Sequence, residues 1–283
     1  MTLRELIKYG EDTLREAGIE EALSDAKNLA MYILNIDYTG MLMKANEEIS
    51  FEDEEAYKDI VCIRCSHYPC QYLVGTQDFM GYTFKVSEGV LIPRPETELL
   101  VETALELTQG RANCKTLDMC CGTGCIGISY KLKRIEQGFL DDRVTLVDIS
   151  PDAISLTEEN VFNLGAKCDI IKSDLFEDVD AEKYDLIMSN PPYIPTMDIE
   201  DIMEDVREYE PRLALDGMED GLFFYKEIIE KLKRYLYEDG IVIFEIGYNQ
   251  YEDVRKLLND AGFFDVSCKK DYAGHNRIVI ARR

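Results

Sequence analysis

The segment Asn190-Pro191-Pro192-Tyr193 combines residue types that can hold a planar amino group. Proline fixes φ at about −65° and carries no backbone N–H, so the segment presents carbonyl oxygens. The Asn190 side chain adds one more acceptor oxygen, along with its amide donors. Two acceptors can take both N–H bonds of an NH2 group while the Tyr193 ring packs on its flat face. An ordinary proline turn is the alternative, but it leaves unexplained why the segment follows an apolar strand and a glycine-rich turn.

A nitrogen held in this way aims its lone pair at a neighbouring electrophile, so proximity and orientation supply most of the catalysis. An amide nitrogen is a poor nucleophile because its lone pair is delocalised. Hydrogen bonds that favour a pyramidal nitrogen as charge develops therefore stabilise the transition state. The sulfonium methyl group of S-adenosylmethionine is a matching electrophile, and the segment predicts N-methylation.

A glycine-rich segment, Gly122-Thr123-Gly124-Cys125-Ile126-Gly127, lies between a predicted strand and a predicted helix. Its G-x-G-x-x-G spacing permits a tight turn and close approach of the backbone to a ligand. Asp148 ends the next predicted strand, where a carboxylate can accept hydrogen bonds from both hydroxyls of a ribose. Enzymes that use NAD and enzymes that use S-adenosylmethionine share this arrangement. A dehydrogenase therefore remains open, as does a turn that binds nothing.

Two further aspartates follow predicted strands. Asp118 lies just before the glycine-rich turn, where its carboxylate suits the amino group of S-adenosylmethionine better than a pyrophosphate. Capping of loop amides is an equally good explanation. Asp174 follows the third predicted strand and can accept from the exocyclic amine of an adenine, with helix capping as the alternative.

The elements that must position these residues alternate between strand and helix from residue 98 onward. Nearly continuous apolar strands separated by helical periodicity predict an α/β fold with a doubly wound parallel sheet. The last two strands have no helix between them, so we expect that end of the sheet to be antiparallel. The seven predicted strands are 115–120, 143–149, 168–173, 184–190, 240–246, 263–272 and 276–283.

The chain ahead of residue 98 has a different pattern. Residues 1–70 show only helical periodicity and predict a small helical substrate-recognition domain of three helices, capped by Thr2, Ser24 and Ser50. Residues 71–97 predict a β-hairpin linker, with strands at 71–79 and 82–86, and Pro95 in the first turn of the next helix. Residues 98–283 form the predicted catalytic domain.

Composition narrows the function classes. The chain has 283 residues and a net charge of −25, so a phosphate backbone repels it and we expect no direct nucleic-acid partner. It has no apolar run long enough for a membrane helix, and its nine cysteines lack disulfide spacing. The first residues carry acids where a signal peptide would be apolar, so we expect no signal peptide. We expect a cytoplasmic monomer. The ligand types of a zinc site occur at Cys62, Cys65, His67 and Cys70, but they crowd into one short stretch, and we expect no metal.

Taken together, these motifs resemble the release factor glutamine methyltransferases of the PrmC or HemK family. The matching residues are Asn190 to Tyr193, Pro93-Arg94-Pro95-Glu96-Thr97-Glu98, Asp118 to Gly124, Asp148, Ser173-Asp174 and Asn276-Arg277-Ile278-Val279. The resemblance covers almost the whole chain and implies a Rossmann-like seven-stranded class I S-adenosylmethionine-dependent methyltransferase fold. It also implies methyl transfer to the side-chain amide nitrogen (N5) of the glutamine in the Gly-Gly-Gln loop of class I peptide chain release factors.

Site residues carry over from the resemblance by position. Asn190, Pro191, Pro192 and Tyr193 would bind the glutamine, with the Asn190 side chain and the Pro191 carbonyl as acceptors. The cofactor site would contain Asp118, Cys120, Cys121, Gly122, Thr123, Gly124, Asp148, Asp174, Leu175 and Asn190. Two positions depart from the family. Cys120 replaces a glycine and loses its conformational freedom, and Leu175 replaces the tryptophan of some relatives, leaving less area for stacking on adenine.

Other readings remain open. The same chemistry on a ribosomal-protein glutamine or a nucleic-acid adenine is the nearest alternative, and the charge argues against the second. A dehydrogenase leaves the Asn190 segment unexplained, and a non-enzymatic binder of translation factors gains support only from Cys120. Residues 198–220 hold 10 acids against 2 Lys/Arg. We expect this acidic rim to steer the basic surroundings of a Gly-Gly-Gln loop.

Overall fold

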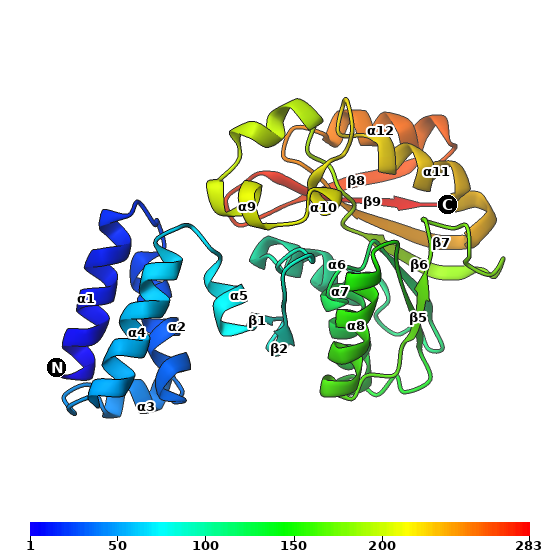
Figure 1. Cartoon of the computed structure of the whole chain (residues 1–283). Helices are drawn as coiled ribbons and strands as arrows, with labels where there is room; N and C mark the ends of the chain where they lie inside the picture. Colours follow the sequence, from blue (N-terminus) through cyan, green and yellow to red (C-terminus); the bar gives the residue numbers. More distant parts are fainter. The chain divides into compact units, whose positions relative to one another are not determined.

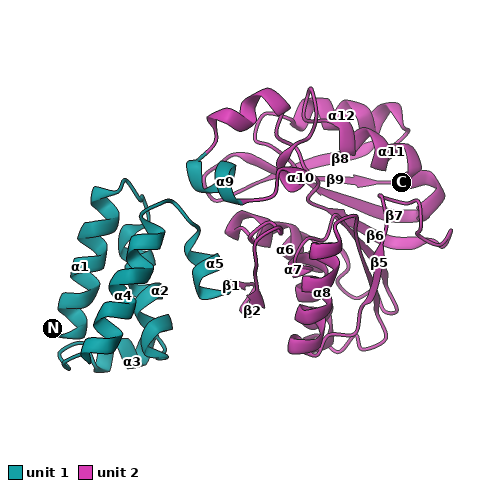
Figure 2. Cartoon of the chain, viewed as in Figure 1, with its two compact units in different colours: residues 1–76, 203–209 teal, residues 77–202, 210–283 magenta.

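The computed structural model describes residues 1–283 and divides into two compact units (Figure 2). The first contains residues 1–76 and 203–209, and the second contains residues 77–202 and 210–283. No helix in the chain is both long and apolar enough to cross a membrane.

The first unit is a helical bundle. Its helices are α1 (Leu3–Glu16), α2 (Ala22–Leu34), α3 (Tyr38–Met43), α4 (Phe51–Arg64), α5 (Cys70–Val74) and α9 (Glu204–Tyr209). Amphipathic spacing buries Leu3, Leu6 and Leu14 of α1 against α2 and α4. The caps at Thr2 and Ser50 are confirmed by hydrogen bonds from backbone N–H groups to both hydroxyls.

The helical pattern was wrong in three places. The second helix starts at Ala22, ahead of the predicted cap Ser24, because burial of Ala22 in the bundle core draws the helix back. α3 was not predicted. The predicted strand 71–79 is confirmed at Thr76–Phe79 but wrong before it, where α5 begins after Pro69 and ends where Gly75 takes a φ of 77°.

An ion pair ties α2 to α4 inside this unit. The Arg64 Nε atom donates to Asp25 at 2.7 Å, and both side chains are buried. The Arg64 guanidinium also lies 3.5 Å from Asp205, and the Tyr209 hydroxyl donates to the Ser66 carbonyl oxygen at 2.7 Å. These contacts anchor α9, which comes from the acidic part of the sequence.

A two-stranded hairpin, β1 (Thr76–Phe79) and β2 (Tyr82–Lys85), begins at the last residue of the range 1–76 and otherwise belongs to the second unit. It is followed by the short 3-10 helix η1 (Pro95–Thr97) and α6 (Glu98–Leu107). Its sheet has seven strands in the order β5-β4-β3-β6-β7-β9-β8 (Figure 1). They are β3 (Lys115–Met119), β4 (Arg143–Asp148), β5 (Asp169–Lys172), β6 (Tyr184–Ser189), β7 (Leu236–Glu245), β8 (Asp265–Lys270) and β9 (Asn276–Arg282).

Pairing within the sheet confirms the predicted class. β5, β4, β3, β6 and β7 run parallel, and β9 pairs antiparallel with both β7 and β8. The connecting elements are α7 (Cys125–Glu136), α8 (Pro151–Leu164), η2 (Thr196–Asp201), α10 (Arg212–Leu215), α11 (Phe223–Tyr235) and α12 (Tyr251–Asp260).

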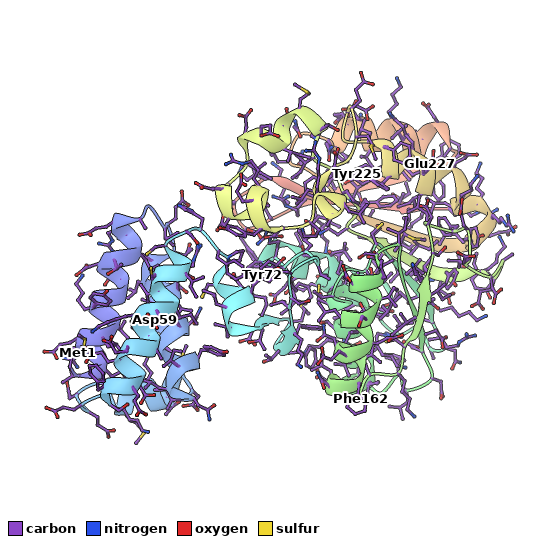
Figure 3. All side chains as sticks on the ribbon, in the orientation of Figure 1. Met1, Asp59, Tyr72, Phe162, Tyr225 and Glu227 are labelled. Atoms are coloured by element: carbon purple, nitrogen blue, oxygen red, sulfur yellow. The ribbon has the colours of Figure 1, made fainter.

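Two apolar cores lie on the two faces of the sheet. One packs α11 and α12 against it, and the other packs α6 and α7 against the opposite face. Tyr225 of α11 is fully buried and donates to the Glu245 carbonyl oxygen at 2.7 Å, whereas Phe162 of α8 is 84% exposed (Figure 3). The carboxyl ends of the parallel strands are thus held at one edge of a rigid sheet.

Candidate functional site

The candidate site lies at the carboxyl ends of β3, β4 and β6, which are neighbours in the sheet. Met119 is level with Val147 of β4 and with Ser189 of β6. The residues that follow these positions therefore emerge side by side, and they include Cys120, Asp148 and Asn190. Ligands of open parallel sheets bind at this edge.

The glycine-rich turn joins β3 to α7. Gly122 and Gly124 take φ values of 56° and 78°, which glycine reaches at little cost. Gly127 lies in the first turn of α7, where an added Cβ would come within 2.3 Å of the Leu146 side chain. The glycines thus serve both the turn and the close packing of α7 on β4.

Asp148 binds the glycine-rich turn directly. One carboxylate oxygen accepts from the Gly122 N–H at 2.8 Å, and the other accepts from the Ser150 N–H at 2.9 Å. Burial raises the pKa of Asp148, while these backbone hydrogen bonds oppose that rise. Each oxygen has a second lone pair, so the carboxylate can still accept from ribose hydroxyls.

Asp118 lies behind the turn. It is completely buried, its Oδ2 atom accepts from the Gly127 N–H at 2.8 Å, and its Oδ1 atom has no hydrogen-bond partner. Burial raises the pKa of Asp118 to about 8. The side chain holds the start of α7 and does not line the cavity described next.

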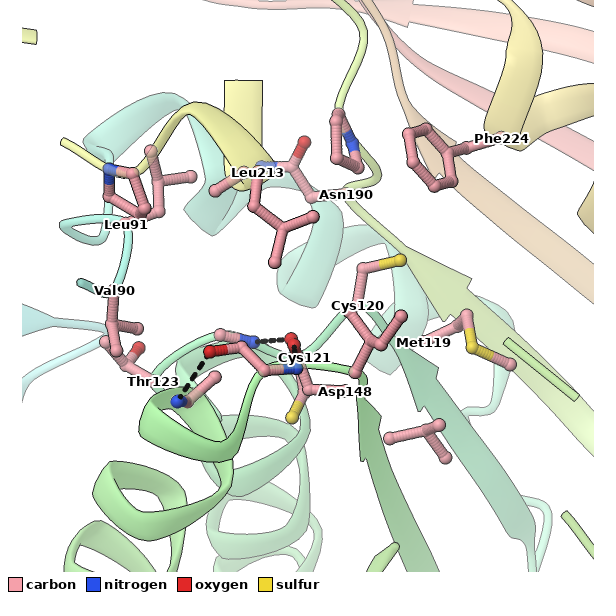
Figure 4. A pocket seen from close by; sticks show the side chains of 18 of the residues that line it. Val90, Leu91, Met119, Cys120, Cys121, Thr123, Asp148, Asn190, Leu213 and Phe224 are labelled. Atoms are coloured by element: carbon pink, nitrogen blue, oxygen red, sulfur yellow. Dashed lines mark hydrogen bonds between the residues drawn. The ribbon is translucent and has the colours of Figure 1, made fainter. Parts of the chain in front are cut away.

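A cavity of about 290 Å³ fills the space between these strand ends. Figure 4 shows Cys120, Asp148 and Asn190 around it, with Leu91, Leu213 and Phe224. The predicted site residues that line it are Cys120, Cys121, Gly122, Thr123, Asp148, Asp174, Leu175, Asn190 and Pro192. Those that do not are Asp118, Gly124, Pro191 and Tyr193.

The asparagine-proline segment is braced from behind. The Tyr193 carbonyl oxygen accepts from the Gln250 side chain at 2.9 Å, and Ile194 pairs with the chain at Leu215 and Gly217. An added Cβ at Gly221 would lie 2.4 Å from that carbonyl oxygen. Burial raises the pKa of Tyr193 to about 12, so its ring stays neutral. The Asn190 side chain donates to the Thr97 hydroxyl oxygen at 3.4 Å.

Sequence reasoning missed several lining residues. Leu213 and Met218 lie within the acidic segment 198–220, Phe223 and Phe224 begin α11, and together they form an apolar wall. Acids surround Leu213 and Met218 in the sequence and conceal them, and the helical periodicity that predicts α11 does not indicate that its first turn lines a cavity. Thr97 was also missed, although it lies within the segment that carries the family resemblance.

Some acids of the acidic rim, residues 198–220, lie beside basic side chains. Within the first unit, Asp205 pairs with Arg64 and Glu204 lies 3.8 Å from His67. Asp198 and Asp201, in η2 of the second unit, are exposed. The exposed acids at 198 and 201 therefore remain as candidates for steering a partner.

Cys120 takes a φ of 61°, a conformation that side chains other than glycine rarely adopt. A β-branched residue is the least tolerated there, so we expect Cys120→Val to lower the free energy of unfolding by about 1–3 kcal/mol. We expect Cys120→Gly to remain within about 1 kcal/mol of the wild type, because relief of strain offsets the entropy of the unfolded chain. Urea unfolding followed by circular dichroism measures both. Equal stabilities of the two variants would contradict strain at Cys120.

Family models match two parts of the chain. The model for the PrmC N-terminal domain matches residues 5–75, and the model for the methyltransferase small domain matches residues 95–208. The chain is 40% identical over 289 residues to a release factor glutamine methyltransferase of Clostridium botulinum, covering 100% of both chains. It is 37% identical over 281 residues to one of Geobacter sulfurreducens, covering 99% of this chain and 96% of the relative.

Solved structures share the fold. The ribosomal protein L11 methylase of Lactobacillus delbrueckii subsp. bulgaricus has a TM-score of 0.50 at 22% identity, covering 70% of this chain and 84% of that one. The 16S rRNA N2 G1207 methyltransferase of T. thermophilus, in complex with AdoMet and guanosine, has a TM-score of 0.51 at 16% identity, covering 74% and 49%. At these identities the likeness concerns the fold alone.

Proposed function

The chain belongs to the release factor glutamine methyltransferase family, and from that membership we propose what this site does. It transfers the methyl group of S-adenosylmethionine to the side-chain amide nitrogen of the glutamine in the Gly-Gly-Gln motif of class I peptide chain release factors. The observation that carries the proposal is Asn190 at the end of β6, facing the same cavity as Asp148 at the end of β4. The protein then acts in the cytoplasm, where release factors work.

The residues of the cavity fit S-adenosylmethionine. Apolar side chains such as Val90, Ile92 and Leu175 line it and suit the adenine, and Asp148 presents carboxylate lone pairs to ribose hydroxyls. The backbone of Gly122 and Thr123 borders the cavity without an intervening side chain at the glycine. When bound, S-adenosylmethionine supplies an electrophilic methyl group.

The chain's own groups bind and orient the glutamine amide. The Asn190 oxygen accepts one of its N–H bonds, which turns the nitrogen lone pair toward the cavity. The Pro191 carbonyl oxygen, the second acceptor that the resemblance implies, belongs to a residue that does not line the cavity. Pro191 and Pro192 offer no competing N–H donor. The Asn190 oxygen stabilises the positive charge that develops on nitrogen, and the nitrogen becomes acidic enough after transfer to lose its proton without a dedicated base.

Mass spectrometry of a class I release factor incubated with the enzyme and S-adenosylmethionine tests the proposal. We expect a gain of one methyl group on the glutamine of the Gly-Gly-Gln motif. A methyl group on a ribosomal-protein glutamine or on a nucleic-acid adenine, with none on the release factor, would overturn the assignment. Binding of NAD in place of S-adenosylmethionine would point to a dehydrogenase instead.

We further propose that the helical domain predicted at residues 1–70 recognises the body of the release factor. The hairpin predicted at 71–97 then links it to the catalytic domain at 98–283. Presentation of the Gly-Gly-Gln loop would in this way depend on contacts made outside the methyl-transfer site.

The acids at 198 and 201 give a separate prediction. We expect Asp198→Asn with Asp201→Asn to raise the KM for release factor by about threefold at low salt and to weaken its salt dependence, because rim charges act mainly on association. Steady-state kinetics at several salt concentrations measure both effects. The matched control is Asp253→Asn with Asp260→Asn on α12, which removes equal charge elsewhere. Identical behaviour of the two double variants would contradict steering.

A further inference from the structure

Glu245 is a buried carboxyl group that the proposed mechanism does not use. It is the last residue of β7, it is only 3% exposed, and its Oε2 atom has no hydrogen-bond partner. Burying a carboxyl oxygen without a hydrogen-bond partner costs free energy, so the position of Glu245 calls for an explanation. No salt bridge involves it, and burial raises its pKa to about 7.

The two arginines near Glu245 form ion pairs with other acids. Arg94 pairs with Glu210, and Arg277 pairs with Asp271. The titratable and charged groups that face Glu245 come from five elements, and they are Arg94 and Glu96 before α6, Cys125 of α7, Tyr193 after β6, Tyr225 of α11 and Arg277 of β9. The two arginines lower its pKa, and Glu96 raises it.

Thr97 lies between Glu245 and Asn190. It is the last residue of η1, and its helical φ of −69° and ψ of −20° continue the chain into α6, so its hydroxyl makes no capping hydrogen bond. Its hydroxyl oxygen instead accepts from the Asn190 side-chain nitrogen at 3.4 Å, and hydrogen bonding from the Thr97 side chain lowers the pKa of Glu245.

We propose that Glu245 is a positioning residue that orients the Asn190 amide through the Thr97 hydroxyl, a role that rests on the proposed function. An ionised Glu245 can only accept, so the Thr97 hydroxyl donates its hydrogen bond to the carboxylate. The Thr97 oxygen then accepts from Asn190, which turns the Asn190 nitrogen toward Thr97. The Asn190 oxygen is left facing the substrate amide as an acceptor.

Protonation of Glu245 removes the constraint on the orientation of the Asn190 amide. A neutral carboxyl can donate to the Thr97 oxygen, and the Thr97 hydroxyl can then donate to the Asn190 oxygen. The Asn190 amide is then free to rotate by 180° and to present its NH2 group to the NH2 group of the substrate glutamine, so that two donors face each other. The acceptor that binds the substrate is lost, although no residue has moved away.

The pH dependence of turnover tests the proposal. We expect the wild-type kcat to fall as the pH falls through about 7, the pKa of Glu245. In Glu245→Gln the new side chain can both donate and accept, so it fixes neither orientation. Its kcat should be about 10- to 100-fold lower at pH 8, and the fall around pH 7 should be absent.

Thr97 variants test whether Glu245 acts through the Thr97 hydroxyl, in a relay of hydrogen bonds from Glu245 to Thr97 to Asn190, or by a local effect of its own charge. Thr97→Val keeps the shape and the ionisable Glu245 but breaks the chain of hydrogen bonds, so it should also lose the fall around pH 7. Thr97→Ser should keep it. The matched control is Thr103→Val in α6, which removes a buried hydroxyl that has no hydrogen-bond partner. It should leave the pH profile unchanged. A fall around pH 7 that persists in Glu245→Gln or in Thr97→Val would overturn the proposal.

Two readouts do not require turnover. The side-chain amide ¹⁵N resonance of Asn190, assigned by its absence in Asn190→Ala, should shift with pH around 7 in the wild type and stay constant in Glu245→Gln. A resonance that does not titrate in the wild type overturns the relay, even if release factor is methylated. Absence of methylation with a titrating resonance would count against the proposed function and not against the relay.

The second readout is thermal stability. Because the folded-state pKa lies above the ordinary value of 4.5, the carboxyl favours folding most below that value, and this contribution is lost as the pH rises through about 7. Glutamine does not titrate. The Tm of Glu245→Gln relative to the wild type should therefore rise between pH 5 and pH 8. A relative Tm that falls over this range would contradict the unpaired burial of an ionising Glu245.

Discussion

Asn190→Ala is expected to reduce methyl transfer to release factor by about 1000-fold while leaving the affinity for S-adenosylmethionine within about threefold of the wild type. The substitution removes the acceptor that both orients the substrate amide and stabilises the charge that develops on its nitrogen. The remaining cavity wall, including Asp148 and the glycine-rich turn, does not depend on this side chain.

Single-turnover incorporation of labelled methyl groups measures the first effect, and isothermal titration calorimetry measures the second. Circular dichroism shows whether the variant is folded. Asn259→Ala, an exposed asparagine of α12, is the matched control and should transfer methyl groups at the wild-type rate. Transfer by Asn190→Ala within tenfold of the wild type would show that the acceptors lie elsewhere.

Asp148→Ala is expected to weaken binding of S-adenosylmethionine by about 100-fold. The change leaves the N–H groups of Gly122 and Ser150 without their acceptor and removes the group that faces the ribose. The loss at the two N–H groups lowers stability in the free and the bound protein alike, whereas ribose hydroxyls left without an acceptor cost about 1–3 kcal/mol of binding free energy, and about 2.7 kcal/mol corresponds to the expected loss of affinity.

Calorimetric titration of the cofactor checks this result. Asp148→Asn keeps one acceptor oxygen for a backbone N–H and should lose only about tenfold. Asp260→Ala removes an exposed acid of α12 and should bind normally. If Asp148→Ala binds the cofactor within threefold of the wild type, Asp148 shapes the turn without holding the ribose.

Most of the sheet was predictable because its strands carry long apolar runs between helical segments. Each of the seven predicted strands corresponds to one in the structure, including the antiparallel pair at the end. Boundaries were less certain. β7 begins at Leu236, four residues before the predicted start, because Leu236 pairs with Tyr184 across an irregular register that polar residues conceal in the sequence.

From the pattern of strands alone, a site residue could be predicted only where it ends or directly follows a strand. Asp148 and Asn190 meet that condition, and register brings them to one edge. Glu245 meets it too, at the end of β7, but nothing in the sequence separates a buried acid from an exposed one. The role of Thr97 depends on a hydrogen bond across 93 residues, a separation that no local pattern encodes.

The position of β9 has a consequence for synthesis of the chain. β8 is made before β9 but has no partner except β9, which lies between it and β7. A nascent chain that has reached residue 275 therefore exposes the backbone edge of β7 and leaves β8 unattached. Exposed edges of this kind recruit other strands. The arrival of β9, the penultimate strand in space, covers the edge of β7 and attaches β8, which leaves β5 and β8 as the two edges of the sheet.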